Sequence, residues 1–265
     1  MAELQLIPNQ VVEAKITSIL ATKLDMRGLF TVDTSLTTAS GLSKRIYKST
    51  YSGKVEKLLK GQKSSADAYG SVTLTHSDYE IARYQTAYKY NDMDYMADAT
   101  IVDRLSSGAA ETITNQLRAE YFAELAKISN TFTGTGSVYE AVVDAVASLK
   151  NAAEEDTNGL FIIMGADLRA AVRKDALFEA SKQGEILYTG QFGTIAGIPC
   201  VYSNSVPENT IYLTEKPAVT LFVKQEGQVE TERDVDSKDN SVFYTRYGVV
   251  ALTDDTRSCI ITMQA

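Results

Sequence analysis

The sequence predicts an α+β protein in which long helical segments and β-strands share one chain. Residues 97–128 carry apolar side chains every four residues, which is typical of a long amphipathic helix. Residues 160–164 (LFIIM) form an uninterrupted apolar run, as expected of a strand buried on both faces. Residues 190–213 combine glycine and proline steps with two short β-type runs, which favours a hairpin.

The composition excludes several classes of protein. Hydrophobic residues make up 44% of the 265 residues, which is enough for a core and too many for a disordered chain. No apolar run approaches the roughly 20 residues that span a bilayer, and the N-terminus lacks a secretory signal, so we expect no membrane partner. Cys200 and Cys259 are the only cysteines and show no CxxC spacing, which favours a reduced, cytosolic setting.

Positive charge is concentrated in one segment of an acidic chain. The net charge is −8, yet residues 41–63 carry seven cations against Glu56 alone, a net +6 that leaves −14 elsewhere. The cations are Lys44, Arg45, Lys48, Lys54, Lys57, Lys60 and Lys63. A solvated loop, docking onto the acidic surface of a neighbouring copy and DNA binding all remain open. We favour docking, because opposite charges on a self-associating chain give register and specificity.

The rest of the chain is acidic, which argues against an ordinary nucleic-acid-binding domain, whose affinity rests on neutralising phosphates. An acidic surface would suit a protein that lies close to packed DNA without adhering to it.

The N-terminal third predicts an arm followed by a long hairpin. Residues 1–43 begin with helical spacing and continue as a Thr-, Ser- and Gly-rich stretch, which indicates an extended arm. Residues 44–90 alternate apolar and polar side chains in strand-like runs that include residues 83–90, around a Lys-, Ser- and Gly-rich middle at 53–70. Such a hairpin buries little of its own surface, so we expect it to pack against another subunit.

The segment 97–128 predicts a helix of about 45 Å, at 1.5 Å per residue. Its apolar stripe repeats every four residues from Ile101 to Leu125, and such a repeat drifts around a helix of 3.6 residues per turn. The stripe should therefore meet different neighbours at the two ends. Gly108 should weaken or bend the centre.

Residues 133–225 predict a compact α/β domain. Ser137 and Glu140 have the spacing of a capping box at the start of a helix, and the run at 160–164 leads into a second amphipathic helix. In the hairpin that follows, four residues set the shape of the backbone: Gly193, Gly197, Pro199 and Pro207. Further strands are predicted at 218–224, 241–251 and 258–263.

The sequence offers little for catalysis. His76 is the only histidine and follows a strand with neither cysteine near it, so we predict no catalytic residue. A multi-histidine zinc site is excluded by count, and the acidic segment 234–240 lacks the glycine of a calcium loop and places Lys238 at a ligand position, so we predict no metal or cofactor. A small α/β enzyme in residues 133–225 remains an alternative and would need a pocket with perturbed titratable groups.

The run from Gly193 to Val201 reads Gly-x-Ile-x-Gly-Ile-Pro-x-Val and is followed by Ser203 and a Val-Pro step. It resembles the major capsid proteins of tailed double-stranded DNA bacteriophages, which have the HK97-type fold, and the order of segments is similar. The resemblance implies an N-terminal arm at 1–43, an E-loop hairpin at 44–90, a peripheral domain with the spine helix at 91–132, an axial domain at 133–225 and returning peripheral strands at 226–265.

The resemblance also implies partners. Copies of the chain would form pentamers and hexamers of an icosahedral shell around phage DNA, with the seven cations of the E-loop contacting a neighbouring subunit. The arm begins almost at Met1, which implies a separate scaffolding protein or none; portal and decoration proteins are further expected partners. Assembly would take place in the host bacterial cytoplasm. A bacterial encapsulin shell of the same fold is the nearest alternative, and no crosslinking is predicted.

Overall fold

The computed structural model describes residues 12–16, 18, 29, 31–53, 55–64, 70–98, 100–149, 157–174 and 193–264. The chain divides into two units, which we call the body (residues 1–39 and 82–265) and the hairpin (residues 40–81). Each unit is described by itself. The body contains two sheets and the long helix, and the hairpin forms a two-stranded sheet of its own.

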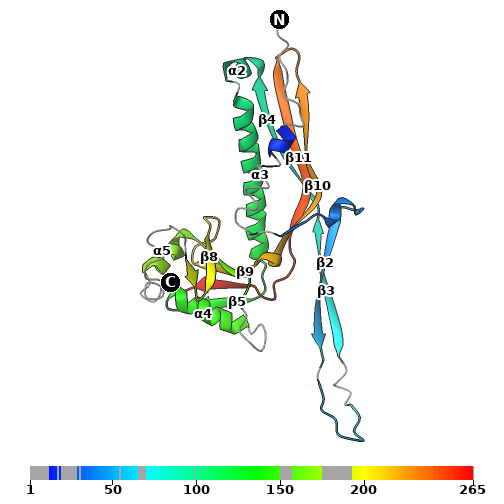
Figure 1. Ribbon diagram of the computed structural model, residues 1–265, viewed down its shortest axis with the longest axis vertical. Helices are drawn as coiled ribbons and strands as arrows, with labels where there is room; N and C mark the ends of the chain where they lie inside the picture. The colour runs from blue at the N-terminus through cyan, green and yellow to red at the C-terminus, as the bar shows by residue number, and fades with distance from the viewer. Residues whose placement is uncertain are drawn as a thin grey trace. The chain divides into compact units, whose positions relative to one another are not determined.

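The first sheet of the body has four strands in the order β1-β10-β11-β4 (Figure 1). They are β1 (Thr31–Asp33), β4 (Ala82–Asn91), β10 (Val219–Arg233) and β11 (Asp239–Leu252). β1 runs parallel to β10, and the other neighbours are antiparallel. The 3-10 turn η1 (Ser35–Thr37) follows β1, and Lys224 Nζ donates hydrogen bonds to the carbonyl oxygens of Leu36, at 3.1 Å, and of Ala39. The chain before the hairpin is thereby fixed to β10.

The expectation that residues 83–90 belong to the hairpin is wrong. They form β4, which pairs with β11 in an unbroken register from Gly248↔Ala82 to Asp239↔Asn91. The reason is the row of tyrosines on one face of β4, which needs a large apolar partner surface. Tyr84 is buried in the core of the body, and the Tyr88 hydroxyl lies 3.2 Å from Ser106 Oγ of the long helix. That helix provides the partner surface.

The long helix is α3 (Ile101–Leu125), preceded by the short α2 (Asp92–Ala97). It is shorter than predicted, about 37 Å for 25 residues. The helical conformation is interrupted at Asp98, between α2 and α3, and the Asp98 carboxylate accepts hydrogen bonds from Thr100. The helix continues through Gly108. No helix in the described part of the chain combines the length and the apolar character that crossing a membrane requires.

The two ends of α3 meet different partners, which confirms that its apolar stripe spirals. Its N-terminal half runs along the first sheet (Figure 1), where Ser106 meets Tyr88. At its C-terminal end the ring of Phe122 lies 6.1 Å from the ring of Tyr212, which belongs to the second sheet. One helix therefore contributes to the packing of both sheets.

The second sheet has six strands in the order β5-β12-β9-β6-β8-β7. They are β5 (Thr131–Gly134), β6 (Leu160–Met164), β7 (Thr194–Ile195), β8 (Ile198–Tyr202), β9 (Thr210–Glu215) and β12 (Cys259–Met263). Two helices pack on one face, α4 (Val138–Leu149) and α5 (Ala166–Lys174). The predicted capping box starts α4, since the Ser137 amide donates to the Glu140 carboxylate and the Glu140 amide donates to Ser137 Oγ.

β6 is buried on both faces, as its apolar run predicts. Leu160, Ile162 and Met164 point into the core with α4 and α5, whereas Phe161 and Ile163 point into the core that contains the end of α3. A strand covered on both faces is expected to be apolar throughout.

Sheet membership differs from the expected grouping in two places. The predicted pairing within residues 190–213 is wrong, because β8 and β9 are separated by β6, which pairs with both. The actual hairpin joins β7 to β8. β12 belongs to the second sheet and β10 to the first, whereas the sequence predicts one domain at residues 133–225 and a separate part at residues 226–265. Pairings between distant segments do not follow from the local apolar pattern, which identifies strands but not their neighbours.

A polar junction holds the two sheets together. Three described segments pass from the first sheet and its helix to the second sheet, at residues 126–130, 215–218 and 253–258. Asp255 is buried and accepts hydrogen bonds from the Ser129 amide and hydroxyl, at 3.3 and 2.8 Å. The Asn130 side chain donates to the backbone carbonyls of Asp255 and Ser258. The segments at 126–130 and 253–258 are therefore linked by side chains.

The segment at 215–218 joins the same network through its contacts with residues 253–257. The Arg257 guanidinium donates to the Glu215 carboxylate at 3.0 Å and to the carbonyl of Asn158 at 3.1 Å. The amides of Thr253 and Asp254 both donate to the carbonyl of Ala218, which lies in the 3-10 turn η3 (Lys216–Ala218). Because buried polar groups are costly to leave unpaired, these bonds fix how the chain crosses between the sheets.

We predict that Asp255→Ala lowers the free energy of unfolding of the body by about 1–3 kcal/mol, because it removes a buried carboxylate that accepts two hydrogen bonds from Ser129, and hydrogen bonds to charged groups are among the stronger ones. Asp254→Ala is the matched control, since the exposed Asp254 carboxylate accepts only from Thr256 in its own turn. Urea unfolding of both variants measures the difference, and equal losses would contradict the role given to Asp255.

Candidate intersubunit surface

The hairpin is built from two ten-residue strands, β2 (Ser43–Ser52) and β3 (Ser71–Glu80). They pair antiparallel without any shift from Ser43↔Glu80 to Ser52↔Ser71. Side chains alternate between the faces of a strand, and directly opposite residues share a face. The register therefore assigns each side chain to one of two faces.

We call one of these faces the tyrosine face. Its opposed pairs, taken from the tip toward the base, are Tyr51 with Val72, Ser49 with Leu74, Tyr47 with His76 and Arg45 with Asp78. Four of its apolar side chains are largely exposed: Tyr47 at 61%, Tyr51 at 71%, Val72 at 59% and Leu74 at 63%. A contiguous exposed apolar surface on a folded chain is typical of an interaction site.

Side chains on the tyrosine face contact each other across the strands. The rings of Tyr47 and His76 lie 6.1 Å apart at an angle of 52°. Arg45 donates to Asp78 twice, from Nε to Oδ1 at 2.6 Å and from Nη2 to Oδ2 at 2.8 Å. The hydrogen bonds from Arg45 hold the pKa of the Asp78 carboxyl below its ordinary value. The charged pair near the base of this face is thus closed on itself.

Tyr51 lies against two glycines at the tip end of the tyrosine face. Gly53 comes directly after β2 and Gly70 directly before β3, and a Cβ atom on either of them would collide with the Tyr51 ring. The absence of side chains at these two positions lets the ring lie over the backbone. Replacing either glycine with a larger residue would displace the Tyr51 ring.

We call the opposite face the lysine face. It carries Lys44, Ile46, Lys48, Thr75, Ser77 and Tyr79. Ile46 is buried, and Lys44, Lys48 and Tyr79 are half-buried. The two faces therefore differ: apolar groups on the lysine face are covered within the chain, and those on the tyrosine face are not.

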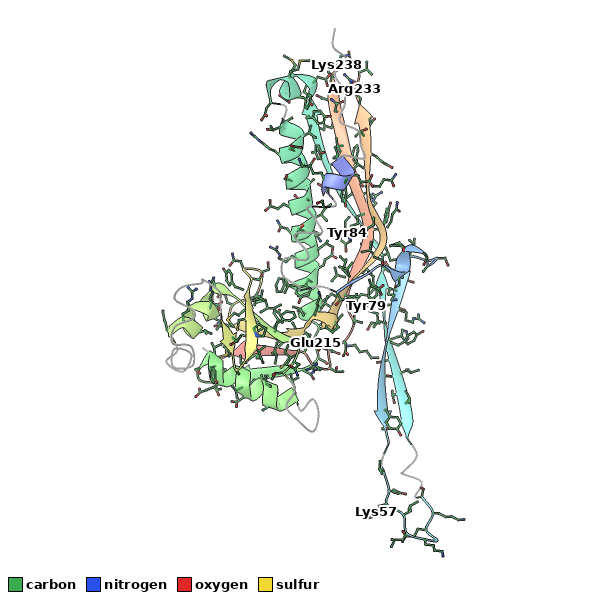
Figure 2. The ribbon with its side chains drawn as sticks, viewed as in Figure 1. Lys57, Tyr79, Tyr84, Glu215, Arg233 and Lys238 are labelled. Atoms are coloured by element: carbon green, nitrogen blue, oxygen red, sulfur yellow. The ribbon has the colours of Figure 1, made fainter. Side chains whose placement is uncertain are left out.

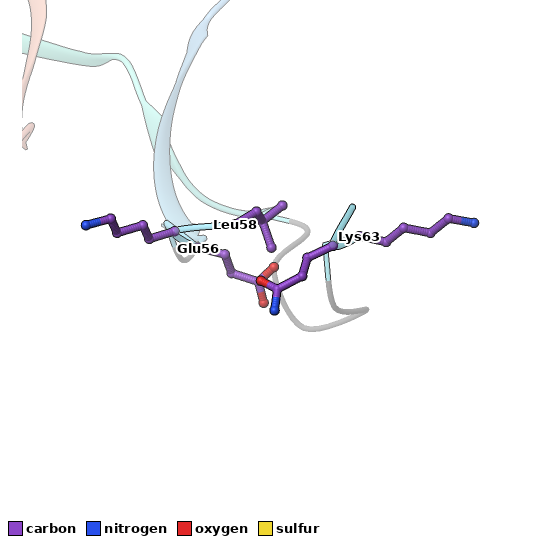
Figure 3. A pocket seen from close by; sticks show the side chains of 5 residues that line it. Glu56, Leu58 and Lys63 are labelled. Carbon is purple, nitrogen blue, oxygen red and sulfur yellow. The ribbon is translucent and has the colours of Figure 1, made fainter. Parts of the chain in front are cut away.

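The tip of the hairpin is cationic and exposed. A shallow hollow there is lined by Glu56, Lys57, Leu58, Gln62 and Lys63, and Lys63 extends away from the Glu56 carboxylate (Figure 3). Figure 2 places Lys57 at this tip and Tyr79 toward the other end of the strands. The turn is closed by the Gln62 amide, which donates to the carbonyl of Leu59 at 3.0 Å. The hollow consists of exposed side chains and resembles no enclosed ligand pocket.

Six of the seven predicted contact cations are described, and they occupy three different places in the hairpin. Arg45 lies on the tyrosine face, Lys44 and Lys48 lie on the lysine face, and Lys57, Lys60 and Lys63 lie at the tip. Lys54 lies outside the described residues. The structure does not gather these cations into a single patch.

The four residues predicted to shape the second hairpin lie in the body. Gly197 has φ of 81° in the two-residue turn between β7 and β8, a conformation that favours glycine. Pro199 pairs with Thr194, the Gly193 carbonyl accepts from the Cys200 amide at 3.2 Å, and the Pro207 carbonyl accepts from the Thr210 amide. These groups set backbone shape and carry no reactive side chain.

The described residues offer little reactive chemistry. No group of three or more His, Cys, Asp or Glu side chains among them is placed to hold a metal ion. Burial raises the pKa of the Cys259 thiol to about 11, so the thiol stays protonated at neutral pH. Burial first, and then a hydrogen bond to Glu120, raise the pKa of Tyr84 above its ordinary value. These groups serve packing.

The two sheets, the long helix between them and the hairpin define the class of HK97-type capsid subunits. A solved structure from Mycobacterium phage Che8 matches with a TM-score of 0.64 at 17% identity and covers 87% of this chain and 88% of that chain. The capsid of the native GTA particle matches with a TM-score of 0.70 at 13% identity and covers 92% of this chain and 91% of that chain. These likenesses confirm the predicted fold.

The chain belongs to the phage capsid protein family, whose sequence model matches residues 77–262. The major capsid protein of Staphylococcus phage phiMR11 is 23% identical over 271 residues, which cover 97% of this chain and 93% of that relative. The chain is therefore a phage capsid protein, as the step from Gly193 to Val201 indicated.

Sequence reasoning located the hairpin but missed the tyrosine face. The alternation of Val72 and Leu74 is visible in the sequence, as are Tyr47 and Tyr51. What the sequence lacks is the register, because the two strands are joined by a long tip instead of a two-residue turn that would fix it. Without the register, nothing shows that all four side chains share one face.

We predict that Arg45→Gln raises the pKa of Asp78 toward its ordinary value, because the hydrogen bonds from Arg45 are the largest cause of its depression. Since the folded-state pKa is depressed, the pair stabilises the hairpin at neutral pH, and its contribution is lost as pH falls through that depressed value.

Carboxyl-carbon NMR of the free subunit measures this titration. Asp234 is the internal control: its pKa is lowered mainly by the amide of Asp236 in its own turn, so it should not move in the variant. An unchanged Asp78 titration would show that Arg45 does not set it.

Proposed function

We propose that this chain is the major capsid protein of a tailed double-stranded DNA phage. Its copies assemble through pentamers and hexamers into an icosahedral shell that encloses the genome. The single observation that carries the proposal beyond the family is the hairpin. It exposes apolar and cationic side chains that a neighbouring subunit could cover. Rings of this kind require heterologous contacts that close, in which one surface of a subunit meets a different surface of the next.

The proposal gives each part of the chain a role. Residues 1–39 act as the arm and residues 40–81 as the E-loop. The first sheet with α3 forms the peripheral domain around the spine helix, and the second sheet with α4 and α5 forms the axial domain. Sheet membership supports these limits better than the sequence-based boundaries, because strands of one sheet share hydrogen bonds and a core.

Charge supports contact between the hairpin of one copy and the body of another. The hairpin carries seven cations and four anions, a net +3, and this leaves −11 on the body of a chain whose total is −8. Opposite net charges on two surfaces of identical subunits favour head-to-tail association and disfavour contact between like surfaces.

Partners beyond the chain itself follow from the same role. An acidic body suits an inner surface that tolerates packaged DNA without sequence-specific binding. A separate scaffolding protein, a portal and decoration proteins are proposed partners, and assembly is proposed to occur in the host bacterial cytoplasm. The role is structural and includes no catalysis.

The encapsulin alternative is not better supported. The matching family model describes phage capsid proteins and covers residues 77–262, which include most of the body. Terminase and portal genes beside this gene would support the phage role, whereas a neighbouring cargo enzyme with a docking peptide would favour an encapsulin.

Electron microscopy and light scattering of the purified protein, alone and co-expressed with its gene neighbours, test the proposal. Closed shells are expected. A chain that remains monomeric under all salt and concentration conditions, and that forms no shells beside its gene neighbours, would overturn it.

We predict that reversing the charge of Lys54, Lys57, Lys60 and Lys63 to Glu blocks shell assembly while the subunit stays folded. The four changes turn the net charge of the hairpin from +3 to −5, so it would repel an acidic neighbour. Replacing the same four residues with Arg keeps the charge and is the matched control. Shell yield is measured by sedimentation and folding by circular dichroism; normal shells from the Glu variant would show that the tip charge is incidental.

A further inference from the structure

We propose that the tyrosine face is the side of the hairpin that is buried against the body of a second copy of this chain, and that the lysine face points away from that copy. This inference rests on the proposed shell function and specifies its contact. It shifts the main anchor of the hairpin from the lysines to a row of apolar side chains: Tyr47, Tyr51, Val72 and Leu74.

The register makes this row continuous. The three pairs from Tyr51↔Val72 to Tyr47↔His76 are consecutive on one face of β2 and β3. Neighbouring pairs on the same face are within reach of aromatic and long side chains, so the row forms one surface. Its four apolar members are 59% to 71% exposed, whereas the apolar Ile46 on the lysine face is 7% exposed. Only the tyrosine face still has apolar surface to bury.

The charges favour the same face. Burying an unpaired charge is costly, whereas a hydrogen-bonded pair loses less when water is excluded. On the tyrosine face, Arg45 and Asp78 satisfy each other through two hydrogen bonds. The closed pair can therefore sit at the rim of an interface without leaving either of its charges unmatched.

The tip end of the row presents the exposed ring of Tyr51. Gly53 and Gly70 give the Tyr51 ring room to lie over the strand ends, and any side chain at either position would displace it. Tyr51 is 71% exposed there and offers a large apolar area for contact. Aromatic residues of this kind are enriched at the energetic centres of protein interfaces.

The occupant is a second copy of the chain, for two reasons. A two-stranded hairpin is marginally stable by itself and gains from a covering surface, and under the proposed shell function a neighbouring copy is the available surface. The net −11 of the body also complements the net +3 of the hairpin, so the cationic tip would steer the apolar face onto it.

Two neighbouring residues provide a matched test. Leu74 lies on the tyrosine face, and Thr75, the next residue of β3, lies on the lysine face; both are exposed. Leu74→Cys and Thr75→Cys are each made in a Cys200→Ser background, in which the remaining thiol, Cys259, is 1% exposed. Each variant is co-assembled at a low fraction with the parent protein, and its reaction with a maleimide is timed in free subunits and in shells.

In free subunits both thiols should react at similar rates. In shells the thiol at position 74 should react about ten-fold or more slowly, because interface cores exclude water and reagents, while the thiol at position 75 should keep its rate. Exclusion of the Leu74→Cys subunits from shells that accept the Thr75→Cys subunits would support the same conclusion.

Equal protection at both positions, or protection at position 75 alone, would overturn the inference while shells still form. Protection at position 74 that appears only in DNA-filled shells and not in empty ones would assign the face to nucleic acid and overturn it too. If the parent protein forms no shells at all, the proposed function fails, and this outcome is distinct from a wrong assignment of the face.

Discussion

The polar junction between the two sheets is the constraint on which the rest of the body depends. Ser129, Asn130 and Asp255 join the end of α3 to the returning chain, and Arg257 joins that chain to β9 through Glu215. Asp255 and Glu215 are buried, and Asn130 and Arg257 are half-buried. Separating the sheets would break their hydrogen bonds and would also open the apolar contact between Phe122 and Tyr212. The long helix α3 and the two sheets are therefore held in one arrangement by contacts within the subunit.

The hairpin differs from the body in how little apolar surface it buries. Its strands pair fully with each other, but they bury little, and most large apolar side chains of the tyrosine face remain in water. The body has two apolar cores of its own, whereas the apolar side chains of the tyrosine face are left exposed, so folding and assembly of the subunit can be separate events. For a capsid protein this division is useful, because free subunits must stay folded and soluble while still offering a surface that drives association.

Local patterns in the sequence predict the elements well and their partners poorly. The capping box at Ser137, the buried strand at 160–164 and the spiral stripe of α3 all follow from spacing alone, and the structure confirms them. The placement of β4 beside β11 and of β12 in the second sheet does not follow, because both depend on pairings between distant segments. The same limit hid the tyrosine face, which exists only in one register of β2 and β3. It also hid the junction, in which Ser129 and Asp255 lie 126 residues apart and Glu215 and Arg257 lie 42 residues apart.

Hydrogen–deuterium exchange of free subunits and assembled shells tests most directly whether a neighbouring copy completes the hairpin. The amides of β3 should exchange quickly in free subunits, because an isolated hairpin opens readily, and about two orders of magnitude more slowly in shells. The amides of β6, buried on both faces within the subunit, should exchange slowly and at the same rate in both states. Exchange of β3 that is equally fast in shells and in free subunits would contradict the account.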